Sequence, residues 1–137
     1  MPIEYRSDLL RRILASLHRE APGVRGSAVI TIDGFVIAVY PLGWDSDIQD
    51  PTGGENVAAM SAVVVGQAER TMTRLAQGEL ERVLMEGEKG AVAVFPITGD
   101  SALALLIDKD AKLGLTLHAA RRAAQELRGI LKKEKEE

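Results

Sequence analysis

Two short apolar segments flank the dipeptide Asp33-Gly34, in the stretch VITIDGFVIAVYP from Val29 to Pro41. Asp-Gly favours a two-residue type I′ hairpin turn, in which both turn residues have positive φ. In that register three apolar pairs face each other: Ile32 with Phe35, Ile30 with Ile37, and Ala28 with Val39. The opposite face of the hairpin is apolar as well, since it carries Val29, Thr31, Val36 and Ala38. Because a sheet with one solvated face alternates apolar and polar residues, we expect helices on both faces and therefore a three-layer α/β/α domain.

Apolar residues at helical spacing predict a helix near each end of the chain. The first helix runs from Ser7 to about Arg19, and its apolar stripe is Leu9, Leu10, Ile13, Leu14 and Leu17. The last helix starts near Lys112, and its apolar residues recur at spacings of four and three, at Leu113, Leu117, Ala120, Ala124, Leu127 and Leu131. The final residues 132–137, KKEKEE, are expected to form a solvated, frayed tail.

The second predicted helix, from about Val57 to Ala76 with Asn56 as its N-cap, has two apolar faces. We assign the larger face to the core of the domain: Val57, Met60, Val64, Ala68, Met72 and Leu75. The other face has small residues that leave room for another backbone, and it consists of Ala59, Ala62, Val63, Gly66, Arg70 and Thr73. A helix that is apolar nearly all round is usually buried on both sides. We therefore expect this second face to be a homodimer interface.

Three further strands are predicted, from Gly78 to Met85, from Ala91 to Ile97 and from Ser101 to Asp108. The turns between them are the charged segment 86–90 and Gly99-Asp100. The first of these strands is the most polar, which is typical of an edge strand protected by charge. The predicted order of elements is therefore α-β-β-α-β-β-β-α, without an internal repeat.

Length and composition exclude several classes of protein. The 137 residues fit one domain spanning 1–137, and the absence of cysteine excludes disulfides and thiolate metal sites. A net charge of −3 with both signs interspersed argues against a general nucleic-acid binder. No apolar run approaches the roughly 20 residues of a membrane span, and the first residues are too charged for a signal peptide. We expect a cytoplasmic protein that binds neither nucleic acid nor membrane.

Candidate catalytic and metal-binding residues do not form a set. Three aspartates, Asp45, Asp47 and Asp50, lie in the long loop from Pro41 to Asn56, but the glycine and bidentate glutamate of a calcium loop are missing, so we interpret it as a solvated acidic loop. A site built on His18 and His118 lacks a third ligand. Arg121 and Arg122 could bind an acidic partner or a phosphate, although a charged solvent face is the simpler interpretation. We therefore predict no metal, no cofactor and no enzymatic activity.

Three stretches together resemble the roadblock/dynein light-chain family, and within it the bacterial MglB-type proteins. APGVRGSAVITIDGFVIA is similar to the family's opening, in which Pro-Gly-Val precedes the first strand and an Asp-Gly turn follows it. Residues 56–97 resemble its alanine-rich second helix, followed by a Gly-Glu-Leu entry into the third strand. KLGLTLHAARRAAQEL resembles its last helix, with a Leu-Gly-Leu start and paired arginines. The resemblance covers nearly the whole chain.

This resemblance implies a five-stranded antiparallel sheet with the first and last helices on one face and the second helix on the other. It also implies a homodimer in which the second helices pair and the sheets join edge to edge through the third strand. Such dimers are platforms for Ras-like small GTPases, and MglB-type members regulate the polarity GTPase MglA. Dynein-associated members are instead structural subunits of an assembly, and similar three-layer folds also bind small ligands, so both alternatives stay open.

In such a dimer, the surface left for a small GTPase is the outer rim of the second helix, near the acidic loop. The residues of this rim are Gln67, Glu69, Arg70, Thr73 and Arg74. Arginine is enriched at protein interfaces because its planar fork bonds bidentately and its stem packs. We therefore expect the rim to bind the partner.

Overall fold

Three helices and five strands follow one another in the order expected from the sequence. The computed structural model describes the backbone of residues 3–136 and the side chains of residues 6–132. The first half of the chain forms α1 (Ile3–Glu20), β1 (Val24–Thr31), β2 (Val36–Tyr40) and α2 (Gly54–Arg74). The second half forms β3 (Val83–Glu86), β4 (Gly90–Thr98), β5 (Ser101–Asp108) and α3 (Leu113–Glu136).

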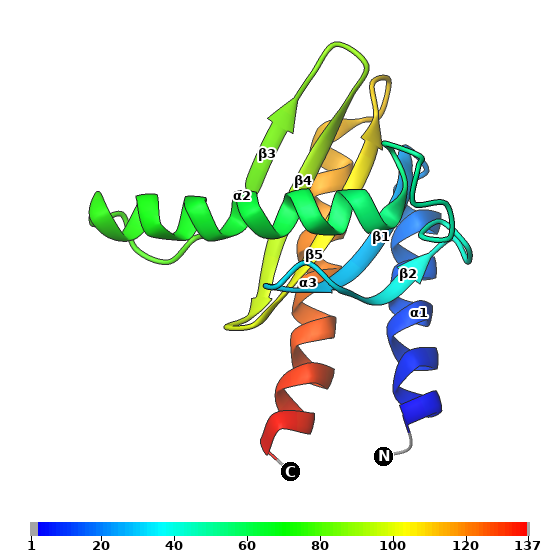
Figure 1. The fold of residues 1–137 in the computed structure, drawn as a ribbon, viewed down its shortest axis with the longest axis horizontal. Coiled ribbons are helices and arrows are strands. Elements are labelled where there is room, and N and C mark those ends of the chain that lie inside the picture. Colours follow the sequence, from blue (N-terminus) through cyan, green and yellow to red (C-terminus); the bar gives the residue numbers. More distant parts are fainter. Residues whose placement is uncertain (1–2, 137) are drawn as a thin grey trace.

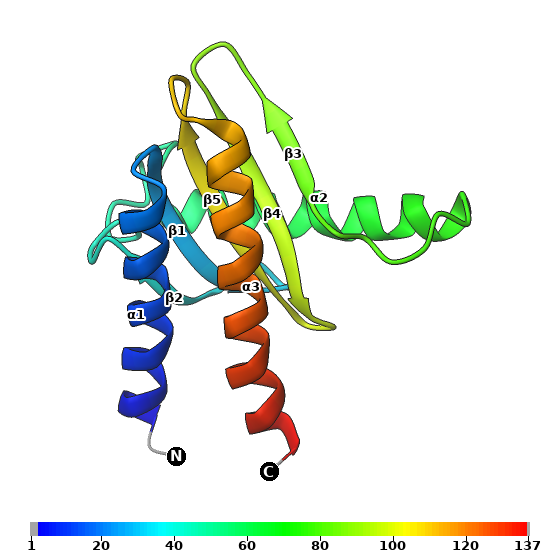
Figure 2. The same cartoon turned by 180° about the vertical axis from the view of Figure 1, so that it is seen from behind.

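The five strands form one antiparallel sheet in the order β2-β1-β5-β4-β3. On one face α1 and α3 lie next to each other and run along the strands, whereas α2 crosses the strands of the other face (Figure 1 and Figure 2). The prediction of a three-layer α/β/α domain with a five-stranded antiparallel sheet is confirmed. The two faces are covered unequally, by two helices and by one.

The two faces of the sheet also differ in the size of their side chains. Consecutive residues of a strand point to opposite faces, so Leu103 and Leu105 of β5 pack under α1 and α3, and Ala102 and Ala104 pack under α2. Alanines of α2 meet them there, since Ala58 and Ala62 belong to the same cluster. These small residues let the axis of α2 lie close to the sheet.

The tip of the β1–β2 hairpin is not the predicted two-residue turn. The Thr31 amide donates to the carbonyl of Phe35 at 2.9 Å, and the Gly34 amide donates to the carbonyl of Thr31 at 3.0 Å, so the loop has three residues. Among the turn residues only Gly34 has a positive φ, of 92°. Such a loop is the common alternative to type I′, a type I turn closed by one left-handed residue.

The pairing of the same hairpin shifts at a β-bulge. Ala28 lies opposite Val39 as predicted, but Ile30 lies opposite Val36. Ile37 is the extra residue of the bulge, so the predicted pairs of Ile30 with Ile37 and of Ile32 with Phe35 are wrong. The longer turn and the bulge compensate for each other, which is why the inner part of the predicted register is correct.

Both ends of α2 differ from the prediction. The helix starts at Gly54 with Gly53 as its N-cap, so Asn56 is not the cap; its side-chain amide instead donates to the carbonyl of Pro51 at 2.8 Å. At the other end Ala76 adopts a φ of 54°, and its amide and that of Gln77 donate to carbonyls of the last turn. This is a Schellman motif, which ends a helix firmly.

Three other boundaries differ from the prediction. The predicted strand from Gly78 to Met85 pairs only from Val83 onward, because the chain leaves α2 through left-handed residues and residues 77–82 form a linker. α1 begins at Ile3 instead of Ser7. α3 continues through Glu136, so the tail expected at 132–137 is helical up to that residue, and Glu137 lies outside the described residues.

Gly26 of β1 provides a test of the packing between the sheet and the loop before α2. A Cβ on Gly26 would lie 2.3–2.5 Å from three carbons of the Trp44 indole, whose Nε1–H donates to the carbonyl of Thr52 at 2.9 Å. We expect Gly26→Ala to lower the free energy of unfolding by about 1–3 kcal/mol, as overpacking does. Urea denaturation measures this change.

The matched control is Gly129→Ala in α3, where nothing lies within 4 Å of an added Cβ. Alanine is about 1 kcal/mol better than glycine in a helix interior, so this variant should be as stable as the original chain or more so. Equal stability of the Gly26→Ala variant and the original chain would contradict the packing described above.

Candidate functional site

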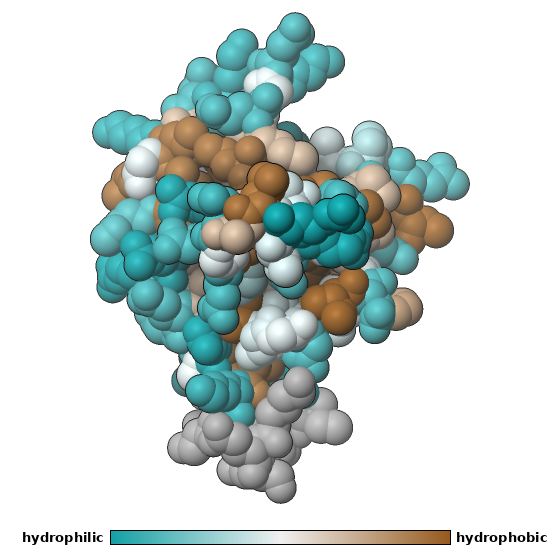
Figure 3. All heavy atoms as spheres, turned by 90° about the vertical axis from the view of Figure 1, so that its left-hand side faces the viewer, coloured by the Kyte–Doolittle hydropathy of each residue, from teal (hydrophilic) through white to brown (hydrophobic). Residues whose placement is uncertain are grey.

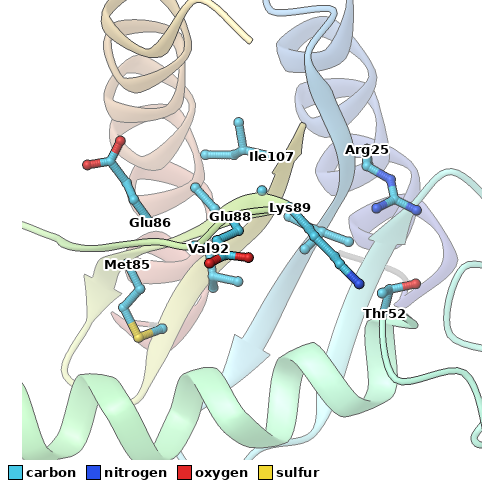
Figure 4. Close-up of a pocket in the computed structure, with 12 residues that line it drawn as sticks. Arg25, Thr52, Met85, Glu86, Glu88, Lys89, Val92 and Ile107 are labelled. Atoms are coloured by element: carbon cyan, nitrogen blue, oxygen red, sulfur yellow. The ribbon is translucent and has the colours of Figure 1, made fainter. Parts of the chain in front are cut away.

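The face of the sheet that α2 crosses is only partly covered. An α-helix is about 10 Å across, whereas the nine residues of β4 extend over roughly 30 Å. On one side of α2 lies the β1–β2 turn, and on the other side the strands continue toward the β3–β4 hairpin (Figure 1). That second side holds a hollow of about 640 Å³ (Figure 4).

The floor of this hollow is apolar. It is formed on the α2 side of the sheet by Met85 of β3, which is 40% exposed, and by the half-buried Val92 and Leu106. Val92 is paired with both Met85 and Leu106 across the strands, so the three side chains form one row. We call this row the apolar floor. In Figure 4 the Met85 side chain points toward α2.

Charged residues surround the apolar floor. Glu88 and Lys89 of the β3–β4 hairpin border it above, and Arg25, which is paired with Asp108 at 3.4 Å, borders it beside Thr52 (Figure 4). Figure 3, seen from the side on which α2 projects past β3, shows hydrophobic surface below the hydrophilic top of the molecule. An apolar centre within a polar rim is typical of a protein–protein interface.

The sequence-based division of α2 into a core face and an interface face is wrong in detail. The residues that α2 buries against the sheet are Gly54, Val57, Ala58, Ser61, Ala62 and Val65. Of the predicted core face only Val57 belongs to this set, whereas Met60 is 56% and Leu75 is 63% exposed. By helical geometry Val64, Ala68 and Leu75 lie on the side of α2 away from the β1–β2 turn, and Met60 lies next to them. This apolar side of α2 borders the apolar floor.

The small residues of α2 instead accommodate the chain's own hairpin. A Cβ on Gly34 would lie 3.2 Å from Cα of Ala59 and 3.7 Å from Cβ of Ala62. The backbone that comes close to these alanines is that of the chain's own β1–β2 turn, whereas the sequence predicted the backbone of a dimer partner. Ala62 is only 8% exposed and belongs to the core, so it is removed from the proposed interface.

The other predicted interface residues remain on the surface. Val63 is 65% exposed, Gly66 is half-buried, and Arg70 and Thr73 are exposed. All five residues predicted to bind a partner are exposed as well: Gln67, Glu69, Arg70, Thr73 and Arg74. Arg70 donates to Oε1 of Gln67 at 3.0 Å, which joins two of them on the outer surface of the helix.

Exposed apolar residues at the hairpin tip were missed by the sequence analysis. Ile32 and Phe35, which were expected inside the covered hairpin, are 49% and 71% exposed. The three-residue loop carries them past the edge of α2. In the sequence both residues look like ordinary strand residues, and only the length of the turn, which the dipeptide Asp-Gly does not determine, would have placed them outside the core.

The candidate polar groups have structural roles. Hydrogen bonds from the amide and hydroxyl of Thr52 lower the pKa of the Asp50 carboxyl, and Asp47 accepts from the amide of Gln49 at 3.0 Å. Within the described residues no group of three or more metal-binding side chains is present. His118 is exposed, and the half-buried His18 contacts Ser27 and Tyr40. Among those residues no helix has the length and apolar character needed to cross a bilayer.

Comparisons with known proteins identify the family. Residues 13–107 match the family model of the Roadblock/LC7 domain, so the chain belongs to the Roadblock/LC7 family. An uncharacterized protein of Methanocaldococcus jannaschii, MJ1340, is 32% identical over 122 residues, which are 89% of this chain and 99% of that protein. Roadblock/LC7 domains are in general regulators or adaptors and not enzymes.

Solved structures of MglB have the same fold. The gliding protein MglB of Thermus thermophilus matches with a TM-score of 0.80 and 22% identity, over 93% of this chain and 92% of that one. A structure described as MglB with tetrameric arrangement matches with a TM-score of 0.79 and 22% identity, over 93% and 91% of the two chains. The predicted family, with MglB proteins among its structural neighbours, is confirmed.

His18 makes the stability of the fold depend on pH. Its Nε2 lies 2.9 Å from Oγ of the buried Ser27, its ring packs edge-on against Tyr40, and burial lowers its pKa from 6.5 to about 4. The unfolded chain therefore takes up this proton first as the pH falls. The contribution of neutral His18 is complete above about pH 6.5 and is lost as the pH falls toward about 4.

We expect His18→Gln, which keeps a hydrogen-bonding group but does not titrate, to lose less stability than the original chain between neutral pH and pH 4. The difference should be about 1–3 kcal/mol in the free energy of unfolding, measured by chemical denaturation at both pH values. His118→Gln is the matched control, since His118 is exposed. If both variants follow the original chain, His18 does not carry this dependence.

Proposed function

We propose that the protein is a homodimer that binds a Ras-like small GTPase of the MglA type and regulates its nucleotide cycle. The observation that carries the proposal is the apolar floor beside α2, bordered by the apolar side of that helix. A monomer would leave Met60, Leu75 and Met85 exposed to water. Exposed apolar surface with a polar rim marks an interaction site.

A second copy of α2 fits this space better than an unrelated ligand. The hollow lies over β4 and β5 next to the β3–β4 hairpin, and the C-terminal end of α2 projects past β3 at the edge of the sheet (Figure 1). In a symmetric pair, the projecting end of each helix would cover the apolar floor of the other copy. An isologous contact of this kind closes after two copies.

The edges of the sheet support the same arrangement. β2, at one edge, carries the bulge at Ile37 and is followed by Pro41, and both features oppose pairing with another strand. β3, at the other edge, pairs regularly with β4 over Val83–Glu86. We therefore place the contact between the two sheets at β3.

The small GTPase is proposed because MglB structures share the fold, and a dimer through the floor leaves the outer surface of α2 accessible. There Gln67, Arg70 and Arg74 are exposed, and Val63 adds an apolar contact. A purely structural subunit would form the same dimer without distinguishing GTP from GDP. Nucleotide-dependent binding therefore separates the two functions.

The dimer is tested with Met60→Glu combined with Met85→Glu. Burying two carboxylates in an apolar contact is costly, so we expect the original chain to have twice the monomer mass by light scattering at micromolar concentration and the variant to have the monomer mass. The control is Ile48→Glu with Leu115→Glu, which changes two exposed apolar residues elsewhere and should leave a dimer. A monomeric original chain, or a dimeric Met60/Met85 variant, would contradict the proposal.

GTPase binding is tested by calorimetry with the small Ras-like GTPases of the same genome, loaded with GTP or GDP. We expect Arg70→Glu and Arg74→Glu each to weaken binding of the GTP form by roughly 1–3 kcal/mol, the range of interface hot spots. The unfolding free energy should change by less than about 0.5 kcal/mol, because both side chains are exposed. Unchanged affinity in the folded double variant would move the docking site away from α2.

A further inference from the structure

The linker between α2 and β3, residues 77–82, lines a groove at the edge of the molecule. Two hollows of about 480 and 350 Å³ lie along it. They share Glu79, Leu80, Pro96 and Arg128, so they form one continuous groove. One end reaches α3 at Arg121, and the other end reaches Glu69 and Thr73 of the proposed partner-binding rim.

Three arginines line this groove: Arg82 of the linker, and Arg121 and Arg128 of α3. All three are exposed, and among the described side chains none of them has an ion-pair partner within 4 Å. The neighbouring Arg122 is different, because it pairs with Glu20 of α1 at 3.6 Å. The structure thus separates the arginine pair that the sequence singled out: Arg122 joins two helices, and Arg121 is available in the groove.

The walls of the groove differ in charge. Arg121 and Arg128 are two turns apart on α3, which places them about 10 Å from each other along the helix axis, and no carboxylate of α3 lines the groove between them. Glu79 and Glu81 lie on the linker wall opposite. The bottom is apolar, with Leu80, Pro96 and Ala124. A bound peptide with acidic groups against the α3 wall and apolar groups on the bottom would match the chemistry of these two surfaces.

We propose that this groove binds an acidic segment of a protein partner, with Arg121 and Arg128 as the residues that recognise its carboxylates. A guanidinium presents a planar fork of donors that matches a carboxylate. In a polyproline II segment, which has three residues per turn and rises 3.1 Å per residue, residues three apart lie on the same face about 9 Å from each other, close to the spacing of the two arginines. The inference deepens the proposed function, on which it rests, since it names the chemistry by which a partner bound at the α2 rim would extend toward α3.

The test uses the full-length chain and a fluorescein-labelled peptide with glutamates at every third position, Gly-Glu-Ala-Ala-Glu-Ala-Ala-Glu-Gly. The matched peptide has glutamine in place of each glutamate. By fluorescence anisotropy we expect the glutamate peptide to bind at least about tenfold more tightly, and to weaken as salt rises from about 0.05 to 0.5 M, because exposed charges are screened. Equal affinity of the two peptides would overturn the proposal.

Arg121→Glu combined with Arg128→Glu should weaken binding of the glutamate peptide by about tenfold or more, because like charges then oppose each other. Arg12→Glu combined with Arg19→Glu is the matched control, with the same charge change at the same seven-residue spacing on the exposed surface of α1. If the charge reversal impairs folding, Arg121→Gln with Arg128→Gln replaces it. Unchanged peptide affinity in the folded α3 variant would overturn the proposal.

Three further outcomes distinguish a small-anion site, the groove assignment and the proposed function. Displacement of the peptide by inorganic phosphate at equal or lower concentration would indicate a small-anion site and overturn the peptide assignment. If the chain is monomeric and binds no small GTPase, but binds the glutamate peptide through Arg121 and Arg128, the proposed function fails and the groove assignment stands. If the chain is a GTPase-binding dimer that does not bind the peptide, the proposed function stands and the groove assignment fails.

Discussion

A helix that crosses a sheet covers only part of it, and the exposed surface of this protein follows from that constraint. α2 covers a band about 10 Å wide on strands of up to roughly 30 Å. On one side of the band, the chain covers its own sheet with the β1–β2 turn, where Gly34 lies against Ala59. On the other side, over Met85, Val92 and Leu106, no element of the described chain closes the hollow. The fold therefore leaves this apolar area exposed.

The other face of the sheet is covered by two helices. α1 and α3 lie along the strands, bury a row of leucines, and are joined by the pair of Arg122 with Glu20. On that side the large residues Leu103 and Leu105 are completely buried. On the α2 side the neighbouring positions are alanines. They let α2 lie close to the sheet but do not increase the area of sheet that the helix covers. A second α2 from another copy would complete this layer, and the outer surface of both helices would remain for a partner.

Much of the fold could be predicted from the sequence because it depends on local patterns. The apolar residues on both faces of the hairpin predicted three layers, and the periodicity of each helix predicted its existence and approximate length. Residues near the turns were harder to place, since a three-residue loop and a bulge at Ile37 change register without changing the hydrophobic pattern. The face of α2 that meets the sheet could not be predicted, because both of its sides are apolar. The burial of Val57, Ala58 and Val65 in the structure shows which side belongs to the core.

The central claim is that a second copy covers the apolar floor, and methionine methyl groups can test it directly. The chain has four methionines, and two of them, Met60 and Met85, lie at the proposed contact. In a mixture of chains with ¹³C-labelled methionine methyls and unlabelled chains, isotope-filtered nuclear Overhauser spectra report only contacts between copies. We expect such contacts from the methyls of Met60 and Met85. Their absence in a sample that is dimeric by mass would place the interface elsewhere and contradict the account.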